Sequence, residues 1–260
     1  MNIEENIKNN FSIDVIMPNY NKANYLEDSI QSVIFQSLKN WNLFIIDDNS
    51  TDNSWKIISK YSKQPNINGI RLKKNMGPAF ARNYGMRISK SKYISFLDSD
   101  DGWHNKKLEK QVKFMEENKL VFTYTDYVPF FEKKFKKKFK KNTNLVDKLN
   151  YDKFIRNTSI NTTTMIILRS ILRTSRFKKV NLEDYLFKCE LLKKNNLFAV
   201  KFPENLAFYR ISDKSRSRDR FKNIFSLWNI NKDYNKLNFL QNVISIFYAI
   251  INSVKKYGIK

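Results

Sequence analysis

The sequence predicts an α/β fold with a mostly parallel sheet flanked by helices. Two observations support this prediction. First, over roughly the first 125 residues, short apolar stretches rich in β-branched residues alternate with stretches whose apolar residues recur at helical spacing. Second, acidic residues directly follow two of the apolar stretches, as in "FLDSDD" at residues 96–101. Because ligands of open α/β sheets bind at the carboxyl ends of the strands, these acids mark the expected site.

The first three elements form a β-α-β unit. The apolar run "IDVIMP" over residues 13–18 predicts a buried strand that is closed by a proline. Residues 26–38 carry apolar side chains at helical spacing, and "NLFIIDD" over residues 42–48 returns to a strand. This order predicts two parallel strands joined by a helix.

The remaining elements of this half repeat the same rhythm. They are a helix, a strand, a helix and a strand over residues 55–61, 69–72, 78–88 and 92–97. Ser50 or Thr51 is the expected N-cap of the first of these helices, and Pro78 suits the first turn of the second. The last strand ends in the acidic stretch.

In the second half of the chain the alternation stops, and an acidic pair, Glu183-Asp184, opens a helix. We expect one domain over residues 1–220, with a first half over about residues 12–125 and a second half over about residues 126–220. A C-terminal helical extension is expected over residues 221–260.

Composition narrows the classes of function. The chain carries 48 Lys+Arg against 25 Asp+Glu, a formal net charge of +23. Such a charge attracts polyanions, which include nucleic acid, an anionic membrane surface and a phosphorylated substrate. Lysine, asparagine, isoleucine and phenylalanine are favoured throughout the sequence, so a compositional origin of the charge, without any partner, is the alternative.

The expected location is the cytoplasm. A single cysteine, Cys189, excludes an internal disulfide framework and fits a reducing compartment. The polar start of the chain lacks the basic and apolar regions of a secretory signal. The stretch "FLQNVISIFYAIINSV" from Phe239 is interrupted by polar residues and falls short of the ~20 apolar residues that a spanning helix needs. No transmembrane segment is expected.

The acids at the predicted strand ends suggest two kinds of binding. Asp98, Asp100 and the adjacent Asp101 suit a divalent cation, because Mg2+ and Mn2+ prefer oxygen ligands and Mg2+ is often bound by one or two carboxylates plus substrate phosphates. Asp47 and Asp48 suit hydrogen bonds to a nucleobase or a ribose. A solvated turn and helix N-capping are the respective structural alternatives.

Four motifs in one order connect these residues to a known family. They are "VIMPNYNKANYLEDSIQSVIFQSLKNWNLFIIDDNSTD", "NMGPAFARNYGM", "YISFLDSDD" and "EDYLF". Together they resemble the family 2 glycosyltransferases of the GT-A fold, over roughly residues 12 to 215. Each motif alone is weak evidence, whereas the four in correct order and spacing are highly specific.

The resemblance implies a catalytic domain over residues 1–220, with a donor half over about residues 12–125 and an acceptor half over about residues 126–220. It also implies a nucleotide-diphosphosugar donor, with a UDP-sugar expected, and Mn2+ or Mg2+ as cofactor. The residues expected at the donor by this analogy are Pro18, Tyr20, Asp48, Asn75, Gly77, Arg82, Asp98 and Arg210. Pro18 and Tyr20 would line the nucleobase pocket, and Asp48 would bind the base. Asp100 is the expected direct metal ligand, and Asp98 is expected at the metal but nearer the ribose.

By the same resemblance Asp184, the second acid of its pair, is the catalytic base. Sugar transfer from a diphosphate needs a stabilised leaving group, which a bound cation provides as a Lewis acid. It also needs the acceptor hydroxyl to be deprotonated, which a positioned carboxylate achieves. A single base opposite the leaving group gives one displacement, so we expect inversion at the anomeric carbon. A favourable interaction with the helix dipole is the structural alternative for Glu183-Asp184.

Four residues near the acids keep two interpretations each. His104 and Asp101 are either further metal ligands or structural residues of the turn. Trp103 either walls the acceptor site or lies in the core. Arg210 either reaches the donor diphosphate or belongs to a solvated basic loop.

The expected activity is the transfer of one sugar to a hydroxyl of a glycan or a lipid-linked saccharide, in the biosynthesis of cell-surface polysaccharide or lipopolysaccharide. The chain lacks the Gln-x-x-Arg-Trp signature of processive synthases. A sugar nucleotidyltransferase is one alternative, but "PNYNK" lacks the glycines that let a backbone approach a triphosphate.

A basic nucleic-acid-binding protein is the other alternative. The segment from Lys133 to Lys141, with Phe135 and Phe139, has the composition that stacks bases and neutralises phosphates. No recognition motif surrounds this segment, so no specific nucleic acid is expected as a partner.

The C-terminal extension also has two interpretations. Its apolar residues recur at helical spacing, which is typical of packing onto a catalytic domain. The same mixture of bulky apolar residues, aromatics and lysines is typical of helices in a membrane interface that contains anionic lipid. Weak peripheral binding at the inner face of the membrane is therefore an additional expectation.

Overall fold

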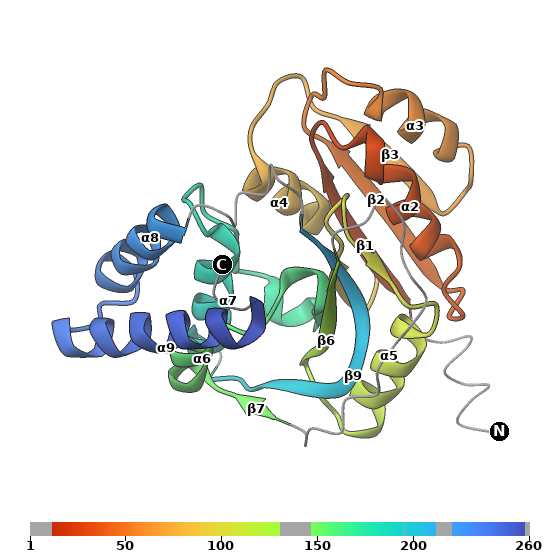
Figure 1. Cartoon of the computed structure of the whole chain (residues 1–260). Helices are drawn as coiled ribbons and strands as arrows, with labels where there is room; N and C mark the ends of the chain where they lie inside the picture. Colours follow the sequence, from red (N-terminus) through yellow and green to blue (C-terminus); the bar gives the residue numbers. More distant parts are fainter. Residues whose placement is uncertain (1–11, 131–146, 195, 212–219, 258–260) are drawn as a thin grey trace.

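In the computed structural model, residues 12–130, 147–194, 196–211 and 220–257 are described (Figure 1). The first part alternates strands with helices, as the sequence predicts. Its elements are β1 (Ile13–Asn19), α2 (Ala23–Ile34), β2 (Trp41–Asp47), α3 (Ser54–Tyr61), β3 (Ile67–Arg71), α4 (Pro78–Ile88) and β4 (Tyr93–Phe96). β1 pairs in parallel with β2 and β4, and β2 pairs in parallel with β3. The four strands therefore end at one edge of the sheet.

Both faces of this half-sheet are buried. Alternate side chains of β1 enter different apolar clusters: Val15 and Met17 pack in one, and Ile16 packs in the other. The first cluster receives α2, α3 and α5, and the second receives α4 and α7. α4 comes very close to β1 at Gly85, where an added Cβ would lie 2.5 Å from Ile16. The close approach fixes the helix that carries Arg82.

The sheet continues with strands from the second half of the chain. These are β5 (Gly102–Trp103), β6 (Phe122–Phe130), β7 (Lys148–Leu149), β8 (Ile166–Leu168) and β9 (Ala199–Arg210). β8 pairs antiparallel with β4 and β6, whereas β6 pairs in parallel with β9. The order is β3-β2-β1-β4-β8-β6-β9-β5, with β7 on β9. The result is a mixed sheet. Its strands β1 to β4 are all parallel and lie in the predicted donor half, and a second parallel pair, β6 and β9, follows beyond β8.

Helices complete the layers. They are α5 (Lys107–Glu117), α6 (Tyr151–Asn157), α7 (Glu183–Lys194), α8 (Arg220–Asp233) and α9 (Phe239–Tyr257), with short 3-10 turns η1 (Thr162–Thr164) and η2 (Arg169–Leu172). Figure 1 shows α8 and α9 beside α6 and α7, far from α2 and α3. The predicted C-terminal helices are thus confirmed. Among the described helices, none combines the length and the apolar character that crossing a membrane requires.

The predicted cap of α3 is wrong. The helix begins at Ser54, close to the predicted start, but its N-cap position is Asn53 and not Ser50 or Thr51. Ser50 is used elsewhere, because its hydroxyl donates to Asp47 Oδ1 at 2.6 Å and accepts the backbone N–H of Asn21 at 3.0 Å. It therefore joins the loops that follow β1 and β2. The basic segment from Lys133 to Lys141 lies outside the described residues.

Candidate active site

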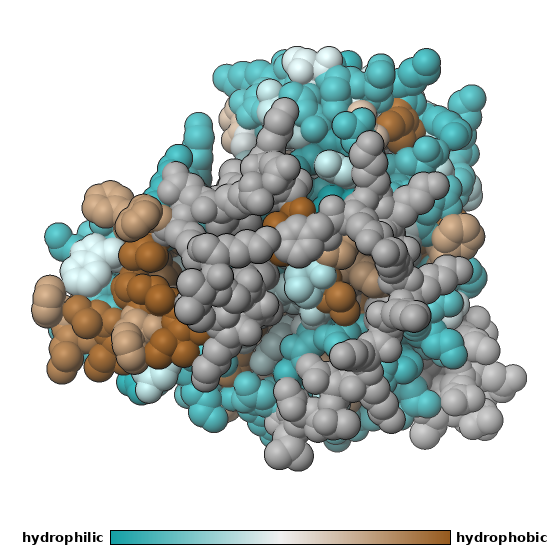
Figure 2. All heavy atoms as spheres, in the orientation of Figure 1, coloured by the Kyte–Doolittle hydropathy of each residue, from teal (hydrophilic) through white to brown (hydrophobic). Residues whose placement is uncertain are grey.

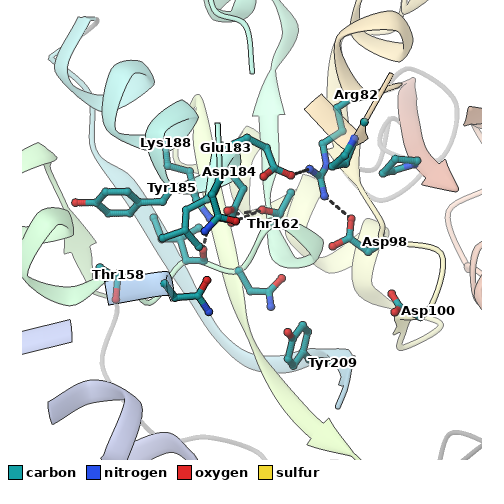
Figure 3. A pocket seen from close by; sticks show the side chains of 18 of the residues that line it. Arg82, Asp98, Asp100, Thr158, Thr162, Glu183, Asp184, Tyr185, Lys188 and Tyr209 are labelled. Carbon is teal, nitrogen blue, oxygen red and sulfur yellow. Dashed lines mark hydrogen bonds and ion pairs between the residues drawn. The ribbon is translucent and has the colours of Figure 1, made fainter. Parts of the chain in front are cut away.

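A cavity of about 830 Å3 opens at the carboxyl ends of β1, β2 and β4 and extends toward α6, α7, α8 and α9 (Figure 3). All ten residues that the family resemblance assigns to the donor, the metal and the base line this cavity. They are Pro18, Tyr20, Asp48, Asn75, Gly77, Arg82, Asp98, Asp100, Asp184 and Arg210. The fold therefore brings the motifs of both halves of the chain to one place.

Asp48 shapes one wall of the cavity by holding a loop. Its two carboxylate oxygens accept hydrogen bonds from the backbone N–H groups of Met76 and Gly77, both at 2.7 Å. Gly77 has a φ of 87°, a backbone conformation that favours glycine, and it is followed by Pro78 at the start of α4. Asn75 lies in the same loop. The buried carboxylate thus fixes the backbone that faces the cavity.

The neighbouring acid, Asp47, belongs to the scaffold. It is fully buried and does not line the cavity. Its Oδ1 accepts hydrogen bonds from Asn19 Nδ2 at 2.8 Å and from Ser50 Oγ at 2.6 Å. Arg71 Nε lies 3.5 Å from its Oδ2. Of the two acids at the end of β2, only Asp48 faces the cavity.

The turn after β4 presents two carboxylates to the cavity, each beside a cation. Arg82 Nη2 donates to Asp98 Oδ1 at 2.7 Å, and Lys22 Nζ donates to Asp100 Oδ2 at 2.5 Å. Within the described residues, Asp98 Oδ2 and Asp100 Oδ1 accept no hydrogen bond. Each carboxylate therefore keeps one oxygen for a ligand.

These two carboxylates fit a divalent cation that takes its other ligands from a substrate. Within the described part of the chain, no group of three or more His, Cys, Asp or Glu side chains could hold a metal ion. Mg2+ is commonly bound by one or two carboxylates together with substrate phosphates, and Mn2+ accepts the same oxygen ligands. Asp98 and Asp100 supply that number of carboxylates.

The third acid of the turn, Asp101, is a structural residue. Its Oδ2 accepts a hydrogen bond from Thr163 Oγ1 at 2.6 Å, and its Oδ1 accepts the backbone N–H of Arg210 at 2.9 Å. The side chain is buried and does not line the cavity. Burial, with Asp98 and Asp100 close by, raises the pKa of Asp101 well above its usual value. Asp101 thus ties the acidic turn to β9 and η1.

The structure also gives the positions of the other residues near the turn for which the sequence left two interpretations. Trp103 lies in the core, where its Nε1 donates to a backbone carbonyl of η1 at 2.8 Å. His104 does not line the cavity, and its Nδ1 accepts the backbone N–H of Lys106 at 3.2 Å. Arg210 does line the cavity, and its Nε donates to the carbonyl oxygen of Asp100 at 2.8 Å. Arg210 therefore braces the turn that carries the two free carboxylate oxygens.

Asp184 lies in the first turn of α7 and lines the cavity (Figure 3). Its Oδ2 accepts hydrogen bonds from Lys188 Nζ at 2.7 Å and from Thr162 Oγ1 at 3.1 Å. Lys188 is buried and also donates to the carbonyl oxygen of Ile160 at 2.7 Å. Burial alone would raise the pKa of Asp184, but Lys188, Arg82 and Thr162 hold it well below its usual range. Asp184 is therefore ionised and held through one oxygen.

Arg82 connects the two sides of the cavity. Its Nη1 donates to Glu183 Oε1 at 2.9 Å, while its Nη2 binds Asp98. The guanidinium is buried and lies over the ring of Phe177. Burial alone would lower the pKa of Arg82, but the two carboxylates raise it above its usual value. The acidic turn after β4 is thus linked through one cation to the helix that carries Asp184.

Sequence reasoning missed three residues of the site: Lys22, Thr162 and Lys188. Lys188 carried a usable signal, since it lies four positions after Asp184 on a predicted helix, where oppositely charged side chains meet. Lys22 carried none, because Asp100, its partner, is 78 positions away. Thr162 lies outside the helix that carries Asp184, so its approach depends on the tertiary fold.

The central mixed sheet flanked by helices is similar to that of solved structures of the GT-A fold. A structure of residues 1–349 of S. aureus TarS in complex with UDP-GlcNAc matches with a TM-score of 0.70 and 18% identity, over 94% of this chain and 73% of that chain. The mannosyltransferase PcManGT from Pyrobaculum calidifontis, in complex with GDP-Man and Mn2+, matches with a TM-score of 0.69 and 14% identity, over 93% and 71%. At these identities the similarity establishes the fold.

The chain belongs to glycosyl transferase family 2, whose family model matches residues 14–176. It is 33% identical over 248 residues to TuaG of Bacillus subtilis (strain 168), a glycosyltransferase assigned to teichuronic acid biosynthesis. It is 31% identical over 247 residues to the Escherichia coli UDP-Glc:alpha-D-GlcNAc-diphosphoundecaprenol beta-1,3-glucosyltransferase WfgD. These matches cover 94% of this chain, with 96% of TuaG and 92% of WfgD. The family predicted from the motifs is confirmed, and the chain is a glycosyltransferase.

Proposed function

We propose that this enzyme transfers a single sugar from a UDP-sugar to a hydroxyl of a lipid-linked saccharide, with inversion at the anomeric carbon and in the presence of Mn2+ or Mg2+. The biosynthesis of a cell-surface polysaccharide is the process that this activity would serve. The observation that carries the proposal is the division of the cavity. Asp98 and Asp100 line one side, and Asp184 lines the other from a different element.

The donor would occupy the side formed by β1, β2, β4 and the loop before α4. Pro18 and Tyr20 would contact the base. Asp48 would contribute to donor binding indirectly, because it fixes the loop Asn75–Gly77 that faces the donor. Asp98 and Asp100 have the free oxygens to hold a divalent cation against the donor diphosphate. When bound, such a cation supplies Lewis-acid stabilisation of the leaving nucleoside diphosphate.

The acceptor would approach from the side of α7. Its hydroxyl oxygen would form a bond to the anomeric carbon of the donor sugar. At the same time the bond from this carbon to the diphosphate oxygen would break, and the electron pair of that bond would leave with the nucleoside diphosphate. The hydroxyl proton would pass to Asp184, whose Oδ1 remains to accept it because Oδ2 is held by Lys188 and Thr162. One displacement inverts the configuration. Lys188 would act as a positioning residue for this base.

The nature of the acceptor is supported by named relatives. WfgD and a second Escherichia coli relative, WfaP, are glucosyltransferases that by name act on alpha-D-GlcNAc-diphosphoundecaprenol, and WfaP is 31% identical over 251 residues. Such an acceptor carries its saccharide on an isoprenoid diphosphate. We therefore propose work at the cytoplasmic face of a membrane.

A donor screen tests the proposal. The protein is mixed with UDP-, GDP- and dTDP-sugars, with and without Mn2+, and its thermal unfolding is recorded, because a ligand that binds only the native state raises the midpoint. We expect UDP-glucose or another UDP-sugar to raise the midpoint, and Mn2+ to enhance the effect. The protein is then incubated with the sugar nucleotide that raises the midpoint and with a GlcNAc-diphosphate-lipid acceptor, and the product of transfer is measured. Stabilisation by none of the sugar nucleotides, or no product from the stabilising one, would contradict the proposal.

A further inference from the structure

The C-terminal helices α8 and α9 bury polar as well as apolar side chains. Leu227 and Ile230 of α8 belong to the apolar core, whereas Asn231, Asn242 and Ser245 are buried polar residues. Asn231 Nδ2 donates to Asn242 Oδ1 at 3.1 Å and to Ser245 Oγ at 3.0 Å. Tyr185 of α7 donates to Asn231 Oδ1 at 2.8 Å, and Ser245 donates to the carbonyl oxygen of Ile155 in α6 at 2.6 Å. Polar side chains thus attach the two helices to the catalytic domain.

The outer surfaces of the same helices are apolar. Eight bulky apolar or aromatic side chains are exposed there, and together they form what we name the α8–α9 apolar face. They are Phe221, Phe225, Phe239, Leu240, Val243, Phe247, Tyr248 and Ile250. Figure 2 shows hydrophobic side chains gathered over these helices, while most of the remaining coloured surface is hydrophilic. An ordinary surface helix turns polar side chains to water, so eight exposed bulky apolar side chains on one helix pair indicate an interaction surface.

The charges around this face are mostly basic. Residues 221–250 contain three lysines, Lys222, Lys232 and Lys236, and one acid, Asp233, a net charge of +2 (3 minus 1). All four side chains are exposed. Lysines that rim a bulky apolar surface are typical of helices that lie in an anionic membrane interface.

The α8–α9 apolar face is continuous with the cavity. Ile224 and Leu227 of α8 and Ala249 and Ile250 of α9 line the cavity that also contains Asp184. Ile250 is exposed as well, so it belongs to both surfaces. A molecule that reaches the base from this side therefore passes the apolar face.

We propose that the α8–α9 apolar face inserts into the interface of an anionic membrane and presents the cavity to a lipid-linked acceptor held in that membrane. This inference rests on the proposed function for the identity of the acceptor. The isoprenoid stays among the lipid chains, its diphosphate lies at the depth of the headgroups and lysines, and its saccharide extends toward Asp184. Burial of the eight side chains drives insertion, and the lysines select anionic lipid.

Vesicle sedimentation tests the proposal. The full chain is compared with the triple variant Phe225→Gln, Leu240→Gln, Phe247→Gln, which changes exposed positions outside the cavity lining and keeps a good helix former at each. Phe35→Gln is the matched control, because Phe35 is an exposed phenylalanine outside the α8–α9 apolar face. The vesicles contain phosphatidylcholine alone or with phosphatidylglycerol.

We expect the wild-type chain and the control to pellet with the anionic vesicles, and the bound fraction to fall with added salt. The triple variant is expected to lose at least about tenfold in partition coefficient, because its lost apolar surface no longer enters the interface. Its transfer to a soluble short-chain acceptor is expected to match wild type, whereas transfer to the vesicle-bound acceptor falls with its binding.

Several outcomes would overturn the proposal: no pelleting of the wild-type chain, equal pelleting of the triple variant, or a wild-type dimer that the triple variant converts to a monomer. The last outcome would assign the face to a second copy of the chain. If the wild-type chain also fails to transfer a sugar to the soluble acceptor, the proposed function is contradicted. The sedimentation result would still decide whether the α8–α9 apolar face binds the membrane.

Discussion

The two sides of the cavity are built in different ways. On the side proposed for the donor, the acids at the strand ends are held by backbone N–H groups, hydroxyls or cations, as Asp48 is by two N–H groups and Asp101 by the Thr163 hydroxyl and the Arg210 N–H. On the side proposed for the acceptor, Glu183 and Asp184 line the cavity together with apolar side chains of α8 and α9. The difference supports the proposed function, in which the first side binds the charged donor and the second side binds a bulkier, partly apolar acceptor.

The largest expected effect comes from the acceptor side. Asp184→Asn removes the base and should lower turnover by about 10²–10⁴-fold, the usual contribution of general base catalysis. Donor affinity should stay near wild type, because the hydrogen-bond partners of Asp184 are Thr162 and Lys188, neither of which is expected at the donor. Turnover and donor binding are measured together, with Asp152→Asn as a control that changes an exposed acid of α6. An equal loss of donor affinity would make Asp184 a binding residue.

The corresponding change on the donor side should behave differently. Asp100→Asn is expected to lower turnover by about 10²–10³-fold, because a neutral amide holds a divalent cation poorly and the leaving diphosphate loses stabilisation. In this variant the turnover should depend less on Mn2+. The rise in thermal unfolding midpoint that donor and Mn2+ cause together should also be smaller than in wild type. Turnover at low Mn2+ that equals wild type would remove Asp100 from the metal site.

Arg82→Met tests the link between the sides. Removal of the buried guanidinium leaves Glu183 and Asp98 without their cation, and breaking a buried pair costs about 3 kcal/mol or more of unfolding free energy. For a chain of this size the thermal midpoint should fall by roughly 6–12 °C. Arg87→Met, which changes an exposed arginine of the same helix, should shift it little. Similar midpoints for the two variants would show that the ion pairs of Arg82 do not contribute to the free energy of unfolding.

A subtler effect is expected at Lys188. Replacement by Met removes the ammonium that contributes most to lowering the pKa of Asp184, so this pKa should rise and the base should be protonated at higher pH than in wild type. The acid limb of the pH–turnover profile should move to higher pH, and the ratio of variant to wild-type turnover should fall as the pH is lowered across the range of this limb. Lys188→Arg should keep the wild-type limb. A uniform loss across this range would assign Lys188 a purely structural role.

The sequence was informative where contacts are local. The strands and helices of residues 12–96 were predicted because apolar periodicity and flanking turn residues act over short distances, and the motif acids of this half directly follow β2 and β4. Strand pairing in the second half was not predicted. β4 pairs with β8, and β6 with β9, across separations of about 70 residues that leave no local pattern.

The ion pairs of the site show the same limit. Arg82 and Glu183 lie 101 positions apart, so their contact depends on the packing of α4 against α7. The role of Ser50 was predicted wrongly for a related reason, since a distant loop competes with the helix end for its hydroxyl. The position of the apolar side chains of α8 and α9 also depended on the tertiary fold, because their spacing fits burial and membrane contact equally well.

The configuration of the product tests the central claim most directly. A single displacement, with the cation site on one side of the cavity and one base on the other, must invert the anomeric carbon. Wild-type enzyme is given its donor and acceptor, and the coupling constant of the new anomeric proton is read by NMR. From a donor with an α-linked sugar, a single displacement gives only the β-linked product, and this is the result that we expect. An α-linked product would contradict it, because retention requires two displacements or a different geometry of attack.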